Sequence, residues 1–208
     1  MSRKKPLHPV LIFLLFAGLL SVESRGAEMR HQISLSVDAS TEQSRKKVST
    51  SEDRPNSTAT TTVESDSEIC TLEIGVKNDS DQEDACLLEW YFISRKTPVR
   101  GDKETVVFDS GKEELTLKKG SGEKRTAISK PFVFTVKTID QVGYDAVDDM
   151  GHSKRTRQGD TYEGYVVLVK AGGKIINQES SSSIYLTDEW LARCAAFVKP
   201  AEGKKKKK

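Results

Sequence analysis

The sequence is poor in the residues that build metal centres and disulfide frameworks. Its 208 residues include only three histidines and three cysteines, too few for most multi-ligand metal sites. Positive and negative charge nearly cancel, with 33 Lys and Arg against 31 Asp and Glu, so nothing favours specific nucleic-acid binding. The sequence has no Gly-x-Ser-x-Gly elbow, no paired metal-ligand spacing and no phosphate-binding glycine loop. We therefore predict no catalytic residue, no cofactor and no metal.

The first 27 residues have the pattern of an export signal. Basic residues at 3–5 precede an apolar run over 10–20, which is about half as long as a membrane-spanning helix requires. Small residues follow the run, and cleavage after Ser24 or Gly26 fits the small-residue rule. We expect residues 1–27 to be a signal peptide, the protein to be periplasmic or extracellular, and the mature chain to lack a membrane-spanning segment.

Charge is unevenly distributed along the mature chain. The leader holds four of the basic residues and one of the acidic residues, so the remainder carries a net charge of −1. The last ten residues, 199–208, contain six lysines, five of them consecutive: Lys204, Lys205, Lys206, Lys207 and Lys208. A run of like charge stays solvated. We expect 199–208 to be a disordered tail that either adds solubility or tethers the protein to an anionic polymer.

Several short segments of the mature chain alternate apolar and polar residues, which predicts β-strands. The segments are 31–37, 69–76, 86–93, 105–108, 125–139 and 162–169. Ala171-Gly172-Gly173 predicts the turn of a hairpin after the last of them. Residues 39–66 are rich in Ser and Thr and almost free of apolar residues. We interpret 39–66 as a long mobile loop that holds at most an exposed strand over 58–63.

The hydrophobic period changes near the C-terminus. Five residues fall on one helical stripe: Trp190, Leu191, Cys194, Phe197 and Val198. This spacing predicts a helix over 188–198, which Thr187 or Asp188 caps and Pro200 ends. About seven strands followed by one helix predict an all-β domain over 28–198, an immunoglobulin-like β-sandwich with a C-terminal α-helix.

A sequence pattern within residues 67–138 supports the same fold. An apolar strand ends in Asn78-Asp79-Ser80, an aromatic strand follows over 88–92, and a glycine turn at Gly120 precedes the next strand. This pattern resembles bacterial extracellular immunoglobulin-like domains of the CARDB and FxLYD kind. The resemblance implies a sandwich outside the cytoplasm with an adhesive, spacer or assembly role and no shared catalytic residues.

The immunoglobulin-like strand order also bears on the cysteines. In that order the C-terminal helix lies near Cys70, so we hypothesise a Cys70–Cys194 disulfide in an oxidising compartment. A hairpin turn at 78–83 would place Cys70 and Cys86 at opposite ends of their strands, which disfavours a bridge between them. The alternative is three buried, unpaired thiols.

The leading hypothesis is an exported, non-enzymatic interaction or structural module of the periplasm or cell envelope, with an envelope protein or an anionic polymer as partner. A carbohydrate-binding or envelope-polymer-binding sandwich is the alternative. It requires an exposed aromatic platform, for which the candidates are Tyr91, Tyr144, Tyr162 and Tyr185. A hydrolase is the third hypothesis, and it requires His152 as the base with Asp148 or Asp149 beside it.

Overall fold

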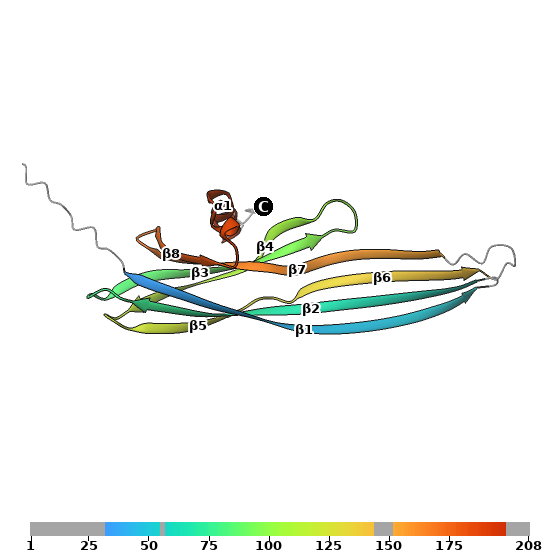
Figure 1. Ribbon diagram of the computed structural model, residues 1–208, viewed down its shortest axis with the longest axis horizontal. Coiled ribbons are helices and arrows are strands. Elements are labelled where there is room, and N and C mark those ends of the chain that lie inside the picture. Colours follow the sequence, from blue (N-terminus) through green and yellow to red (C-terminus); the bar gives the residue numbers. More distant parts are fainter. Residues whose placement is uncertain (1–31, 55–56, 144–151, 199–208) are drawn as a thin grey trace, which may run out of the picture. The chain divides into compact units, whose positions relative to one another are not determined.

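The computed structural model describes residues 32–54, 57–143 and 152–198. The fold is all-β and sandwich-like (Figure 1), with eight strands and the C-terminal helix that the sequence predicts. The elements are β1 (Ile33–Arg54), β2 (Ser57–Asn78), β3 (Asp84–Thr97), β4 (Glu104–Leu117), β5 (Gly122–Ile128), β6 (Phe132–Gly143), β7 (His152–Ala171), β8 (Lys174–Ser180), the 3₁₀ helix η1 (Ser183–Leu186) and α1 (Asp188–Val198). The hairpin between β7 and β8 turns at Gly172 and Gly173, both with positive φ.

Strands β2 and β7 each divide one edge between two partners. Strand β1 pairs antiparallel with β2 along its whole length, and the other edge of β2 pairs with β6 over 57–68 and with β5 over 71–77. Strand β7 pairs with β6 over 152–159 and with β8 over 166–171, on the side opposite β3. At one end β1, β2, β6 and β7 therefore form a single sheet, whereas at the other end the strands separate into two layers.

We call the single-layer part, residues 41–54, 57–68, 134–143 and 152–159, the arm, and the two-layer part the sandwich (Figure 1). One layer of the sandwich contains β1, β2 and β5, and the other contains β8, β7, β3 and β4. The main hydrophobic cluster lies between these layers and includes Leu72, Ile74, Leu88, Phe92 and Val167. In the arm, by contrast, only Val136 belongs to the buried apolar set.

A second hydrophobic cluster covers the outer face of the β3–β7 layer. Tyr91 and Val166 of the sheet pack there against Tyr185 of η1 and Trp190 and Cys194 of α1. The Tyr185 and Trp190 rings meet edge to face at 5.1 Å. Trp190, Leu191 and Cys194 of the predicted stripe thus bind the helix to the sheet, whereas Phe197 of the same stripe is exposed.

The segment between β5 and β6 marks the point where β2 changes partner. Ser129 donates its backbone N–H to the Cys70 carbonyl at 2.9 Å, and its hydroxyl accepts the Cys70 N–H at 2.9 Å. Lys130 then donates its backbone N–H to Asp109 of β4 at 3.0 Å. Pro131 has no N–H to donate, and the strand that the sequence predicts over 125–139 is accordingly two strands.

The prediction of a mobile loop over 39–66 is wrong. These residues form the outer halves of β1 and β2, which stay in register from Ala39 opposite Leu72 to Arg54 opposite Ser57. Polar side chains paired across the strands take the place of apolar residues, so the hydrophobic pattern of a strand is absent. The link from β2 to β3 is also different from the expected hairpin, because these strands belong to opposite layers of the sandwich.

Gly159 lies where β7 leaves β6 and joins β3. Its φ is +125°, and an added Cβ would lie 2.1 Å from the carbonyl oxygen of Val133. We expect Gly159→Ala to lower the free energy of unfolding by about 3 kcal/mol or more, because backbone strain and a backbone clash add. Gly120→Ala is the matched control, since Gly120 has φ +65° and open space around it, which predicts a loss of only about 1 to 2 kcal/mol. Equal losses in urea denaturation would contradict this assignment.

Candidate interaction surface

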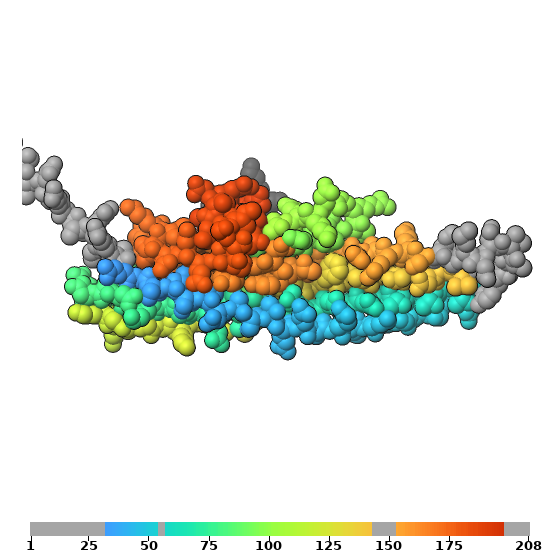
Figure 2. Space-filling model, viewed as in Figure 1, coloured from blue at the N-terminus to red at the C-terminus, as the bar shows by residue number. Residues whose placement is uncertain are grey.

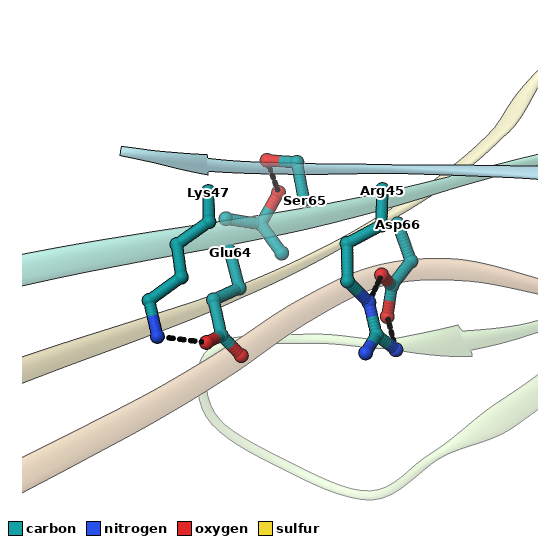
Figure 3. A network of polar contacts seen from close by, with 6 residues as sticks. Arg45, Lys47, Glu64, Ser65 and Asp66 are labelled. Carbon is teal, nitrogen blue, oxygen red and sulfur yellow. Dashed lines mark hydrogen bonds and ion pairs between the residues drawn. The ribbon is translucent and has the colours of Figure 1, made fainter. Parts of the chain in front are cut away.

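A ladder of polar pairs joins β1 to β2 on one face of the arm. Figure 3 shows the Arg45–Asp66 and Lys47–Glu64 pairs on one side of the strands and Ser65 directed to the other side. The Arg45 guanidinium donates to the two Asp66 oxygens at 2.6 and 3.3 Å, and the Lys47 ammonium lies 3.0 Å from Glu64. Further along the arm, hydroxyl pairs continue the ladder: Ser49 with Thr62 at 3.1 Å and Ser51 with Thr60 at 3.2 Å.

This face of the arm continues the core face of the sandwich. In β2 the apolar residues Leu72, Ile74 and Val76 alternate with outward residues, and the same period leads to Glu64 and Asp66. The ladder residues are partly or fully exposed, and the hydrogen bond that Arg45 donates to Asp66 raises the pKa of Arg45. Each such pair contributes only about 0.2–1 kcal/mol, so the arm presents wet, charged side chains in place of a core.

The register also places charge on the fourth strand of the arm. Val136 of β6 lies opposite Glu64 on one side and Arg157 of β7 on the other, and Arg155 follows two residues away on the same face. Basic residues of β1 and β7 thus flank an acidic stripe on β2. No motif in the sequence predicts a site at these residues. The sequence signal that could have found them is like charge at alternate positions, 45 with 47 and 64 with 66, which indicates one charged face on each of two strands.

The outer edge of β1 is covered at its start and open beyond it. Asn177 of β8 donates its side-chain N–H to the Ile33 carbonyl at 2.8 Å, and the Glu179 carboxylate accepts the backbone N–H of Val37. Among the described residues, no strand pairs with the rest of this edge. All side chains from Asp38 to Asp53 are exposed, and Figure 2 shows β1, in blue, along the margin of the sheet.

A hollow of about 450 Å³ lies at the root of the arm, lined by residues that include Arg45, Glu68, Phe134 and Asp160. Two of the carboxylates that line it have hydrogen-bond partners within the protein. Glu68 accepts a hydrogen bond from Gln43 at 3.3 Å, and Asp160 accepts one from the Ser94 hydroxyl at 3.1 Å. Across the described ranges, no group of three His, Cys, Asp or Glu side chains is close enough to hold a metal ion.

The aromatic platform of the carbohydrate-binding alternative is not formed by the described tyrosines. Tyr91 and Tyr185 are buried under α1, and the Tyr91 hydroxyl donates to Glu89 at 2.7 Å. Burial and this hydrogen bond raise the pKa of Tyr91. Tyr162 packs on the main core with its ring 5.5 Å from Phe132. Tyr144 lies outside the described residues.

The other residues singled out by the sequence fall at or beyond the limits of the described chain. His152 is the first residue of β7 and lies opposite Gln141 of β6 in the arm. Asp148, Asp149 and the lysines from Lys204 to Lys208 lie outside the described residues. Within the described ranges, no helix has the length and apolar character needed to cross a bilayer.

Comparisons with known proteins identify no family. No family model and no curated protein matches the chain. Among solved structures, it is similar to a β-glucuronidase from Bacteroides uniformis, with 9% identity over 55% of this chain and 13% of that one and a TM-score of 0.22. A putative ApaA protein from Bordetella pertussis has 12% identity over 61% of this chain and 92% of that one, with a TM-score of 0.20. A protein from Akkermansia muciniphila has 16% identity, coverages of 74% and 75%, and a TM-score of 0.22. Likenesses at these TM-scores carry no argument about function.

The Cys70–Cys194 disulfide is not formed. All three cysteines are free and buried in the structure. Cys70 and Cys86 belong to the cluster between the two layers, whereas Cys194 of α1 belongs to the cluster on the outer face of the β3–β7 layer. The helix covers the face of the sheet that Cys70 does not reach, which removes the geometric basis of the predicted bridge.

Burial also makes these thiols poor nucleophiles. It raises the pKa of Cys70 and Cys86, and that of Cys194 to about 11, so at pH 8 only about one Cys194 in a thousand is a thiolate. We expect iodoacetamide at pH 8 to label the native protein very slowly, and to label all three thiols in urea without a reductant. Mass mapping that found Cys70 and Cys194 both unlabelled in urea would instead support the Cys70–Cys194 disulfide.

Proposed function

We propose that the protein is an exported, non-enzymatic interaction or structural module of the periplasm or cell envelope, and that the arm is its contact element. The arm carries this proposal. Four strands extend beyond the sandwich with only one buried apolar residue, Val136. Ordering such a sheet costs backbone entropy that no core of its own offsets. Its faces and edges are instead available for contact with a partner.

The arrangement of polar groups supports binding over catalysis. Two carboxylates that line the hollow, Glu68 and Asp160, already accept hydrogen bonds from Gln43 and Ser94. The hydrolase hypothesis requires His152 in a concave pocket, whereas this residue pairs into the outer part of the arm. The resemblance of residues 67–138 to immunoglobulin-like assembly domains also favours this role.

Site-specific photo-crosslinking in the envelope fraction tests the contact element. A photo-reactive residue replaces Lys137, exposed on β6 of the arm, or Lys124, exposed on β5 of the sandwich, as the matched control. We expect a defined, salt-resistant adduct from position 137 and none from position 124. Equal adducts from both positions would contradict the role of the arm. Capture that needs residues 199–208 and disappears in high salt would instead support tethering to an anionic polymer.

Export is tested separately, through the leader. The double variant Leu14→Arg/Leu15→Arg interrupts the apolar run over 10–20, and we expect it to abolish processing and leave the full-length chain in the cytoplasm. Leu14→Ile/Leu15→Ile is the control, because it keeps the run apolar. Mass spectrometry of the N-terminus reads the result. An unprocessed wild-type chain in the cytoplasm would contradict export.

A further inference from the structure

The open edge of β1 has a defined hydrogen-bonding pattern. In an antiparallel ladder every second residue directs its N–H and C=O away from the partner strand. Ile33 and Val37 direct these groups outward, because they bond Asn177 and Glu179 of β8. The same period makes residues 45, 47, 49, 51 and 53 the outward ones in the arm. An additional strand can therefore form its backbone hydrogen bonds only with these outward residues.

The charges along this edge are self-complementary about Ser49. If a second β1 runs antiparallel with Ser49 opposite its own copy, Arg45 lies opposite Asp53 and Lys46 lies opposite Glu52. Two-fold symmetry repeats both pairs, so four opposite-charge pairs form and no like charges meet. The outward residues face outward residues in this register, as the hydrogen bonds require.

Other registers that also pair outward residues with outward residues form fewer opposite-charge pairs or bring like charges together. Centring the pairing on Lys47 sets Lys47 against its own copy and Glu42 against Glu52. Centring on Ser44 retains one kind of opposite-charge pair, Glu42 with Lys46. The open edge of β7 is short, since β3 pairs with β7 from Gly159 onward.

We infer that two copies of this chain associate by antiparallel pairing of their β1 edges over residues 44–54, centred on Ser49, to form one continuous sheet from two arms. Because the strands run in opposite directions about Ser49, the two sandwiches lie at opposite ends of this sheet. The contact is small and polar, which predicts a Kd between roughly 1 µM and 1 mM. The inference stands independently of the proposed function, because its test uses the purified protein alone.

Cysteine crosslinking tests the register. Cα atoms of a hydrogen-bonded antiparallel pair lie about 5.5 Å apart, within disulfide range. We expect Ser49→Cys to form a covalent dimer under mild oxidation. Ser44→Cys is the matched control, an exposed serine on the same strand whose two copies would lie about 33 Å apart. Equal crosslinking of both variants, or crosslinking of Ser44→Cys alone, would overturn the register.

Charge exchange tests the same interface without a crosslink. Lys46→Glu sets two like-charge pairs in place of two opposite-charge pairs, and we expect dimerisation measured by sedimentation to weaken about tenfold. Glu52→Lys has the same expected effect, and the double variant Lys46→Glu/Glu52→Lys restores the wild-type Kd. A wild-type chain that stays monomeric up to about 1 mM, open-ended oligomers, or a double variant no better than the single ones would overturn the inference.

Discussion

The bond of Ser129 to both backbone groups of Cys70 is the point on which the architecture depends. It keeps β2 hydrogen-bonded while the partner on its second edge changes from β5 to β6. On one side of this point the layers separate and enclose the main core, and on the other side they merge into the arm. A buried backbone N–H and C=O without partners here would cost several kcal/mol. Pro131 and the Lys130–Asp109 contact fix the direction in which the chain leaves.

The two parts of the sheet draw their stability from different sources. The sandwich buries large side chains such as Phe92 and Phe132 completely or nearly so, which accounts for most of the free energy of folding. The arm depends on backbone ladders and exposed polar pairs such as Arg45–Asp66, each of small value in water. Continuous strands β2 and β7 transmit the order of the sandwich into the arm. The arm is therefore the part expected to open first when the structure loosens.

The sequence predicts the parts of the fold that one local rule determines. Gly172-Gly173 predicts a hairpin because only residues that accept positive φ fit that turn, and the stripe from Trp190 to Val198 predicts a helix because one face is apolar. The arm is not predicted because both of its faces contact solvent, so residues 39–66 lack the apolar alternation of a half-buried strand. The pairing of Arg45 with Asp66, and of Lys47 with Glu64, joins residues about twenty positions apart and depends on register, which composition does not encode. The disulfide hypothesis is wrong for a related reason, since tertiary packing and not local sequence determines which face of the sheet α1 covers.

An open sheet edge is a hazard unless its side chains limit what pairs with it. On β1 the run Arg45-Lys46-Lys47 opposes any strand that would cover it with apolar residues, because ammonium and guanidinium groups are costly to desolvate. The same run repels itself when centred on its own copy, and it is matched by Glu52 and Asp53 only about Ser49. Two-fold pairing in that register uses the β1 edge of each copy and stops there. Pairing of β1 with β7 of another copy would leave a β1 edge and a β7 edge free, and such a contact would continue into a filament. The charges of the edge therefore favour a closed association over an open one.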